Sequence, residues 1–234
     1  MDSGGYDAGE IRGNLADLRA YNRWFGGARL VAREISRMLK GSAGLPGQLR
    51  ILDVATGSGD VPAYLARWAA SRGLEILAEG LDANADMHHE ARTFLDGLSG
   101  SAAGSAAARS VRLLRADALR LPHADDAIDI TTCSNFLHHL DGPDAVLALR
   151  EMKRVSRVGV IVVDLKRDTT AFAAVWAVTR LTTRNRLTRA DGPLSVKRAF
   201  TPAEMASLAE QAGMAGAVVM SDSPIRMVLK WSRT

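Results

Sequence analysis

Short apolar stretches alternate with segments of helical periodicity along the first 165 residues. In the helical segments apolar side chains recur three and four positions apart, as at Val61, Leu65 and Trp68, and form one stripe. Uninterrupted apolar runs of roughly four to eight residues are typical of strands in a parallel sheet that helices cover on both faces. The expected strands are residues 50–54, 75–81, 111–115, 127–133 and 158–165. This alternation predicts a doubly wound α/β fold.

The C-terminal residues follow a different pattern. Residues 201–204, Thr-Pro-Ala-Glu, form a capping box with proline at the first helical position, and predict a helix that stops at Gly213. After a turn at 221–224, apolar side chains alternate with Arg226 and Lys230, as in a strand with one solvated face. We therefore expect an antiparallel pair to close a seven-stranded, mainly parallel sheet with helices on both faces.

Two segments lie outside this core pattern. Residues 1–45 include two helical pieces around the sequence YNRWFGG and indicate a helical flap in front of a domain formed by residues 46–234. Residues 165–200 form an insertion, in which an apolar, Trp-containing helix at 168–183 precedes a basic run. A low-complexity stretch at 99–110 predicts a mobile surface loop.

Composition limits the class of protein. A chain of 234 residues with 47% apolar residues suits one large α/β domain. It has no apolar run of about 18 residues, and its polar, acidic start is unlike a signal peptide, so we expect a cytoplasmic protein. The single cysteine, Cys133, excludes an internal disulfide and a zinc cluster, and is expected to be a small core residue.

The formal net charge of +4 is concentrated in one part of the chain. Between Leu165 and Phe200, eight Lys or Arg stand against two Asp. This distribution argues against a protein that is basic all over. It favours one positive segment that meets an anionic partner, or else an ordinary solvated face.

The sequence ILDVATGSGDVP places small residues where the first strand turns into a helix. Open α/β sheets bind ligands at this position, beyond the carboxyl ends of their strands. Gly57 and Gly59 leave backbone amides accessible there, and Asp82 at the next strand end offers a carboxylate to the hydroxyls of a ribose. Pro62 replaces the third glycine of a dinucleotide fingerprint. The turn therefore predicts a nucleoside cofactor without phosphates.

Four segments follow one another between Ile51 and Val163: ILDVATGSGD, GLDAN, RADALRLPHADDAID and SNFLHHL. In this order they resemble the motifs of class I S-adenosylmethionine-dependent methyltransferases. The first is also similar to the ubiquinone- and menaquinone-biosynthesis methyltransferases, which carry a comparable Asp-Val-Ala stretch. Ala55 stands where the commonest family pattern has its first glycine. The resemblance implies a Rossmann-like fold and S-adenosylmethionine as cofactor.

The resemblance also implies roles for individual residues. The turn would border the methionine part of the cofactor, Asp82 would bind the ribose and Met87 would cover the adenine. From the residues alone, Met87 equally fits the core and Asp117 equally fits a turn cap. The implied cofactor-binding residues are Asp53, Ala55, Thr56, Gly57, Gly59, Asp82, Ala83, Met87, Asp117, Ala118, Leu119, Ser134 and Asn135.

Methyl transfer mainly requires that the acceptor be held close to the methyl group and in line with it. A base matters only if the acceptor must lose a proton. His138 and His139, which follow the fourth strand, are the candidates, and the alternative is that they serve packing. Asp125 and Asp126 have no third ligand at suitable spacing, so we expect no metal.

The insertion provides the clue to the acceptor. An apolar wall with cations favours an amphiphilic acid, a phenolic or quinone-like ring, or a substrate on an acyl carrier. The alternative is that Trp176 belongs to the core and the arginines to a solvated face. We expect transfer to an oxygen or carbon of a small aromatic, quinone-like or polyketide-like molecule. The expected acceptor contacts are Tyr21, Trp24, Trp176, Arg198 and Phe200.

Three other functions stay open. RNA methyltransferases share this fold, and the basic segment contains aromatic residues. Against RNA, residues 134–137 (Ser-Asn-Phe-Leu) differ from the Asn-Pro-Pro-Tyr type of motif, and no appended RNA-binding module is visible, so we do not expect a nucleic-acid partner. Pro62 disfavours a nicotinamide-dependent oxidoreductase, and the motifs alone do not exclude a cofactor-binding protein without catalysis.

Overall fold

The computed structural model describes residues 8–40, 47–100, 104 and 108–233. The expected flap is thus described only for residues 8–40. The predicted mobile loop at 99–110 falls largely outside the described residues, because 101–103 and 105–107 are not among them.

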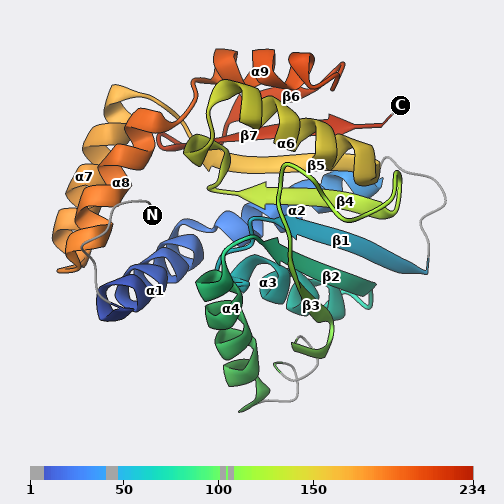
Figure 1. The fold of residues 1–234 in the computed structure, drawn as a ribbon, viewed down its shortest axis with the longest axis horizontal. Helices are drawn as coiled ribbons and strands as arrows, with labels where there is room; N and C mark the ends of the chain where they lie inside the picture. Colours follow the sequence, from blue (N-terminus) through green and yellow to red (C-terminus); the bar gives the residue numbers. More distant parts are fainter. Residues whose placement is uncertain (1–7, 41–46, 101–103, 105–107, 234) are drawn as a thin grey trace.

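Within the described residues, seven strands form one sheet in the order β3-β2-β1-β4-β5-β7-β6 (Figure 1). The first five strands pair in parallel, whereas β7 is antiparallel to both β5 and β6. This confirms the predicted doubly wound, Rossmann-like sheet closed by an antiparallel pair. The strands are β1 (Gln48–Val54), β2 (Glu75–Asp82), β3 (Val111–Arg115), β4 (Ile128–Ser134), β5 (Ser156–Leu165), β6 (Val218–Ser221) and β7 (Arg226–Ser232).

Helices cover both faces of the sheet (Figure 1). Those that pack on it or beside it are α2 (Gly27–Lys40), α3 (Asp60–Ala70), α4 (Ala85–Gly97), α6 (Gly142–Val155) and α9 (Pro202–Gln211). Three more, α1 (Ala8–Phe25), α7 (Thr169–Thr182) and α8 (Arg186–Arg198), lie together beyond one end of the strands. Two short 3-10 turns, η1 (Leu98–Gly100) and η2 (Leu137–His139), complete the described elements.

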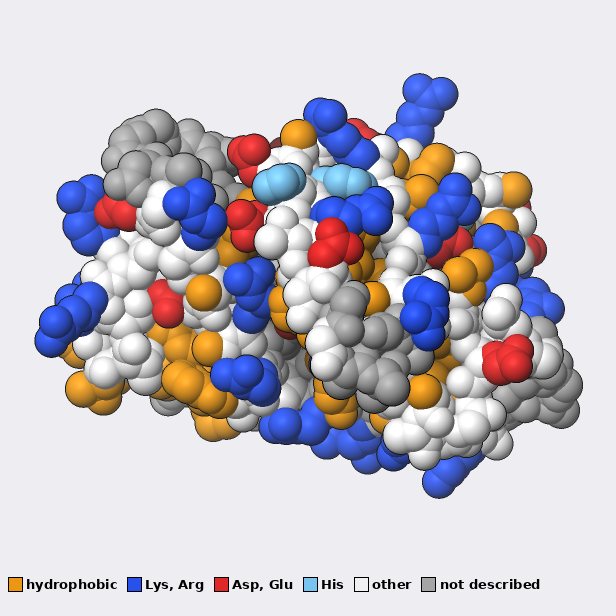
Figure 2. Space-filling model, turned by 90° about the horizontal axis from the view of Figure 1, so that it is seen from below, with side chains coloured by type: hydrophobic (Ala, Val, Ile, Leu, Met, Phe, Trp, Pro, Cys, Tyr) orange, Lys and Arg blue, Asp and Glu red, His pale blue; other side chains and the backbone are white. Residues whose placement is uncertain are grey.

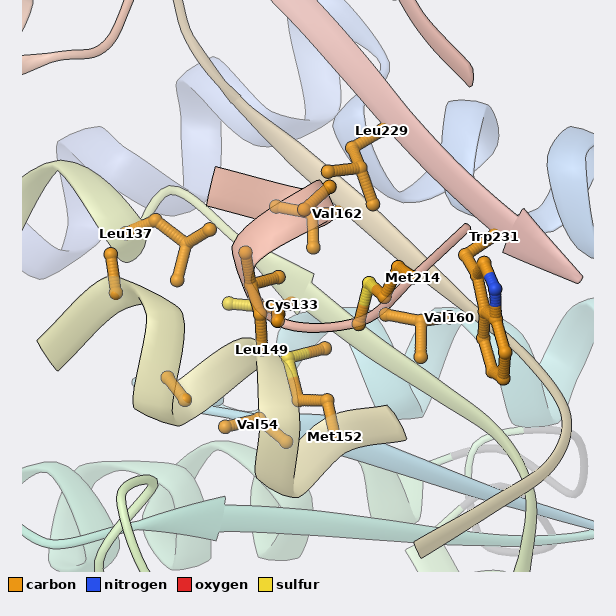
Figure 3. Close-up of a cluster of buried hydrophobic side chains, with 14 of the residues drawn as sticks. Val54, Cys133, Leu137, Leu149, Met152, Val160, Val162, Met214, Leu229 and Trp231 are labelled. Carbon is orange, nitrogen blue, oxygen red and sulfur yellow. The ribbon is translucent and has the colours of Figure 1, made fainter. Parts of the chain in front are cut away.

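Each face of the sheet has its own apolar cluster. On one face, α6 and α9 pack on the strands through residues such as Leu149 and Met152, and Cys133 is fully buried among them (Figure 3). On the other face, α2 and α3 contribute Ile35 and Leu65. A fully buried side chain of this size stabilises the fold by roughly 1.5–3 kcal/mol, so both faces hold the strands firmly.

The helix pair before the sheet breaks where the sequence has two glycines. Gly26 adopts a φ of 71°, in the left-handed region, between α1 and α2. A Cβ at this position would lie 2.9 Å from Nη2 of Arg29, so both conformation and space favour glycine. The break turns α1 away from the sheet while α2 stays packed on it.

Helix α8 was not predicted from the sequence, where this segment was described only as a basic run, and it contains Pro193 in its interior. The side chain of Asn185 caps it by accepting a hydrogen bond from the backbone N–H of Thr188 at 3.1 Å. Leu187 and Val196 are buried on its inner side. Capping and burial together outweigh the low helix propensity of Gly and Pro.

Helices α1, α7 and α8 form a single unit, which we call the helical cap. The carboxylate of Asp17 on α1 accepts hydrogen bonds from the hydroxyls of Thr183 and Thr188, both at 2.7 Å. The hydroxyl of Tyr21 lies 2.7 Å from that of Thr182. The N-terminal helix and the insertion, far apart in sequence, thus meet in one structure (Figure 1). No helix in the described part of the chain is long and apolar enough to cross a membrane.

The predicted capping box is present at the start of α9. Thr201 accepts a hydrogen bond from the backbone N–H of Glu204 at 3.2 Å, and the Glu204 carboxylate accepts one from the Thr201 N–H at 2.7 Å. We expect Thr201→Ala to lower the free energy of unfolding by about 1 kcal/mol in urea titrations. Ser207→Ala, on the exposed face of the same helix, should change it by less than about 0.5 kcal/mol. Equal effects of the two substitutions would contradict a capping role.

Candidate active site

The glycine-rich turn lies at the carboxyl end of β1, between β2 and β4. Ala55, Gly57 and Gly59 have φ values of 55°, 54° and 71°, so the turn runs through the left-handed region three times. A Cβ on Gly59 would lie 3.3 Å from that of Ala91 on α4, whereas a Cβ on Gly57 would meet nothing within 4 Å. Gly59 therefore allows α4 to approach, and Gly57 faces open space where a ligand fits.

Asp82 joins the turn to the end of β2. One carboxylate oxygen accepts a hydrogen bond from the backbone N–H of Gly57 at 3.0 Å, and the other accepts one from that of Asn84 at 2.9 Å. The side chain is only partly buried, so lone pairs on both oxygens remain for further donors. The vicinal hydroxyls of a ribose are donors of this kind.

Asp53 is buried at the end of β1 and lines the cavity described below. Burial raises its pKa to about 7, and a hydrogen bond from the Thr132 hydroxyl at 2.8 Å partly opposes this rise. The hydroxyl oxygens of Thr56 and Ser134 are also buried, without a hydrogen-bond partner among the described residues. A ligand with amino and carboxylate groups would satisfy such polar atoms.

A second carboxylate stands at the first position of α3. Burial raises the pKa of Asp60, and hydrogen bonds from Asn22 at 2.6 Å and Ser58 at 3.1 Å counteract it. Asn22 belongs to α1, so this bond ties the helical cap to the turn. The site therefore gathers carboxylates at its turn end, where a cationic ligand group would be stabilised.

His138 is held by a carboxylate that the sequence reading did not single out. Its Nδ1 lies 2.6 Å from Oδ1 of Asp164, and its backbone N–H donates to Oδ2 at 3.2 Å. Both side chains are buried. Burial lowers the pKa of His138, but the charge of Asp164 and its hydrogen bond outweigh burial, so the net shift is upward. The carboxylate favours the hydrogen on Nδ1 and leaves Nε2 as an acceptor.

His139 behaves in the opposite way. Its ring stacks at an angle on that of His138, with centroids 4.2 Å apart, and has no hydrogen-bonded carboxylate among the described residues. Desolvation and the neighbouring His138 lower its pKa to about 4. His139 is therefore neutral across the physiological range.

These groups surround one cavity of about 530 Å³. Apolar residues of the helical cap form much of its wall, including Leu18, Phe25 and Val178. The predicted site residues that line it are Tyr21, Asp53, Ala55, Thr56, Gly57, Ser134, Asn135, His138 and His139. The structure thus brings together the turn, the end of β4 and the two histidines.

The remaining predicted cofactor residues lie beside the cavity, toward β2 and β3. The Asp117 carboxylate accepts a hydrogen bond from the Leu119 N–H at 2.9 Å. It therefore caps a turn, which was the alternative to a role in cofactor binding. Ala118 and Met87 are buried, and Met87 lies on α4. Ala83 is exposed next to Asp82. These positions suit an adenosine that extends from the cavity along the sheet edge, and their role in binding stays a prediction.

Four predicted acceptor residues do not line the cavity. Trp24 and Trp176 are exposed by 57% and 49%, and Arg180 lies over the Trp176 ring. Phe200 packs against the core cluster. Arg198 is exposed, although its charge acts on His138. Trp176 is therefore a surface residue. It lies neither in the core nor on the wall of the cavity, where it would contact the acceptor.

Several cavity residues escaped sequence reasoning. Asn22, Asp191 and Arg226 come from segments remote from the motifs and reach the site only through tertiary packing. Asp164 could have been predicted as a site residue from the sequence. It lies near the carboxyl end of β5, as Asp53 does in β1 and Asp82 in β2. Among the described residues, no three His, Cys, Asp or Glu side chains are grouped so that they could hold a metal ion.

Residues 51–159 match the model of a family described as a methyltransferase domain. Among solved structures, a SAM-dependent methyltransferase from Aquifex aeolicus superposes with a TM-score of 0.57 and 19% identity, over 85% of this chain and 89% of that one. This likeness shows the fold. Residues 51–159 are therefore similar to a methyltransferase domain, and the chain has the fold of the class of S-adenosylmethionine-dependent methyltransferases.

Within that class, the sequence is similar to methyltransferases of quinone biosynthesis. A 2-phytyl-1,4-naphtoquinone methyltransferase from Synechococcus elongatus is 34% identical over 121 residues, which are 52% of this chain and 46% of that protein. A ubiquinone/menaquinone biosynthesis C-methyltransferase from Vibrio vulnificus is 36% identical over 120 residues, which are 50% and 40% of the two chains. The matches thus span less than half the length of these relatives.

The raised pKa of Asp53 predicts a pH-dependent stability. The folded state binds this proton more tightly than the unfolded state, whose pKa is near 3.8. The contribution to stability is therefore complete below pH 3.8 and is lost as the pH rises to about 7. Between pH 5 and 8, the ligand-free protein should lose on the order of 2–3 kcal/mol relative to Asp53→Asn.

Urea titrations of both proteins at several pH values measure this difference. Asp96→Asn serves as the control, because Asp96 is exposed at the end of α4, and it should show no such pH dependence relative to the wild type. A constant difference between wild type and Asp53→Asn would contradict the raised pKa.

Proposed function

We propose that this protein transfers a methyl group from S-adenosylmethionine to an oxygen or carbon atom of a small aromatic, quinone-like or polyketide-like acceptor. The observation that carries this proposal is the buried His138–Asp164 pair on the wall of a largely apolar cavity that also borders the glycine-rich turn. A cofactor turn, a base and an apolar acceptor space therefore open into the same volume.

The cofactor residues fit the group they would hold. Asp53 and the unpartnered hydroxyls of Thr56 and Ser134 would bind the amino-acid end, and Asp82 would bind the ribose. S-adenosylmethionine supplies a methyl group that its positively charged sulfur already activates. The carboxylates of Asp53 and Asp60, which line the cavity, would favour a positively charged group of the cofactor.

The rest of the chemistry concerns the acceptor. An acceptor that gains a methyl group at a hydroxyl oxygen or a ring carbon must lose the proton it carried there. Nε2 of His138 would take this proton, while Asp164 stabilises the imidazolium that forms. The helical cap would shield the reacting groups from water.

The relatives support a quinone-like acceptor. The names of the Synechococcus and Vibrio proteins refer to naphthoquinone, ubiquinone and menaquinone. A planar ring of this class would contact the apolar side chains that line the cavity, and in its reduced form its hydroxyl or ring carbon can release a proton to a base.

An RNA acceptor has less support. On the face shown in Figure 2, Lys and Arg side chains are spread over the surface and do not form one continuous track. The cavity wall toward the helical cap is apolar, whereas single-stranded nucleic acid is held by a cationic groove with stacking aromatic side chains.

Calorimetry tests the cofactor first. We expect S-adenosylhomocysteine to bind the purified protein with micromolar affinity and NADH not to bind. An acceptor screen with S-adenosylmethionine then covers phenols, reduced naphthoquinones and β-keto esters, with S-adenosylhomocysteine release as readout. NADH binding without S-adenosylhomocysteine binding would refute the methyltransferase proposal, and release that depends on RNA alone would refute the small-molecule acceptor.

The histidine pair makes a prediction about pH. His138 accepts a proton only when neutral, and its raised pKa places the acidic limb of kcat/KM above pH 6.5. His138→Gln should lower kcat by about 10²–10⁴-fold and leave S-adenosylhomocysteine affinity unchanged. Asp164→Asn should shift the limb to lower pH and reduce kcat, because the imidazolium loses its partner.

His139→Gln is the matched control in this series. The His139 side chain is already neutral, with a pKa of about 4, so kcat should change by less than about threefold and the acidic limb should stay in place. Loss of turnover in His139→Gln but not in His138→Gln would show that the base is His139 and would contradict the proposal.

A further inference from the structure

Among the described residues, two cationic residues line the cavity, Arg19 on α1 and Arg226 on β7, and Arg226 comes from a strand far from the glycine-rich turn in sequence. Arg226 is the first residue of β7 and pairs with Leu165, the last residue of β5. Because β7 is antiparallel, its start lies at the edge where the parallel strands end. Arg226 and the preceding residues 223–225 all line the cavity.

The charge of Arg226 is not fully balanced by its neighbours. Its Nη2 donates to Asp222 at 3.0 Å, but the same carboxylate accepts a hydrogen bond from Nη2 of Arg33 at 2.7 Å. One carboxylate thus stands between two guanidinium groups, and the cluster keeps an excess positive charge. Arg33 also contacts Glu34, but that carboxylate is shared with Arg37 and Lys230.

The guanidinium of Arg226 also has unused donors. Within the described part of the chain, Nη2 donates a hydrogen bond to Asp222, whereas Nε is buried without a hydrogen-bond partner. Nη1 lies 3.7 Å from where a Cβ on Gly27 would stand, and the side chain of Asn22 occupies that position. The side chain as a whole is 12% exposed. A desolvated guanidinium with free donors binds anions strongly.

We propose that Arg226 binds a carboxylate inside the cavity, and this inference rests on the proposed function of the site. One further anion would offset the positive charge that Asp222 leaves unbalanced between Arg226 and Arg33. The planar fork of the guanidinium also matches the geometry of a carboxylate. Asp60 and Asp191 line other parts of the cavity, so they direct the anionic end of a ligand toward Arg226.

Two ligands could present this carboxylate. One is the amino-acid end of the cofactor, and the other is an acidic group on the acceptor. In either case Arg226 is a specificity-determining residue, because leaving it unpaired beside a bound ligand would cost affinity.

The experiment uses the full chain with three substitutions. Arg226→Gln removes the charge, Arg226→Lys keeps it without the fork, and Arg37→Gln removes an exposed charge on α2 that touches neither Asp222 nor the cavity. Asp222 keeps Arg33 as a partner in all three, so the fold should persist, which circular dichroism and thermal melts check. Ligand affinities are measured by calorimetry.

The first arm tests the cofactor. S-adenosylhomocysteine is compared with 5′-methylthioadenosine, which keeps the nucleoside and thioether but lacks the carboxylate. If the cofactor supplies the anion, Arg226→Gln weakens S-adenosylhomocysteine on the order of 10- to 100-fold, leaves 5′-methylthioadenosine unchanged, and Arg226→Lys partly restores affinity.

The second arm tests the acceptor with protein saturated with S-adenosylhomocysteine. The probes are 4-hydroxybenzoate and 1-hydroxy-2-naphthoate, each compared with its methyl ester. If the acceptor supplies the anion, at least one acid binds the wild type more tightly than its ester, and Arg226→Gln abolishes the preference while Arg37→Gln keeps it.

The proposal is overturned if Arg226→Gln changes neither the preference for S-adenosylhomocysteine over 5′-methylthioadenosine nor a preference for an acid over its ester, including the case in which neither acid binds. Failure of the wild type to bind S-adenosylhomocysteine is a different result, because it refutes the proposed function itself. The two failures are therefore distinguishable.

Discussion

The site depends on the parallel pairing of β1 with β2 on one side and with β4 on the other. Parallel strands deliver their following turns to the same edge, and at β1 the chain order reverses, which opens a crevice between neighbouring turns. The hydrogen bond from the Gly57 N–H to Asp82 fixes the first of these turns against the second. Without this pairing, cavity residues that are more than a hundred positions apart in the sequence would not lie close together.

The same edge also stores backbone strain. Ala55 and Asn135 are non-glycine residues in the left-handed region, with φ values of 55° and 53°, and both line the cavity. Such conformations cost on the order of 1 kcal/mol each and persist only where the surroundings determine them. Here the backbone hydrogen bonds from Thr56 to Leu81 and from Asn135 to Val163 hold the two turns across neighbouring strands. The left-handed backbone at these two residues directs both turns toward the cavity.

Periodicity predicted the sheet well, because strands buried on both faces leave a strong local signal. The capping box at Thr201 and the glycine turn are local too, since every atom involved lies within a few residues. The helical cap is different. Its joining bonds, from Thr183 and Thr188 to Asp17, link residues more than 160 positions apart, and no local pattern announces them. The cavity residues Asn22 and Arg226 were missed for the same reason, and Trp176, which was predicted as an acceptor contact with the core as the alternative, is half exposed.

The two buried carboxylates near the strand ends show how partners decide chemistry. Asp53 has only hydroxyl donors among its close neighbours, so burial prevails and its pKa rises to about 7. Asp164 instead accepts hydrogen bonds from the His138 ring and from two backbone N–H groups, of His138 and Leu165. The charge of Asp164 and its hydrogen bond to the ring raise the pKa of His138. One carboxylate therefore holds its own proton more tightly, whereas the other makes the neighbouring histidine hold its proton more tightly, although both lie at the same edge of one sheet.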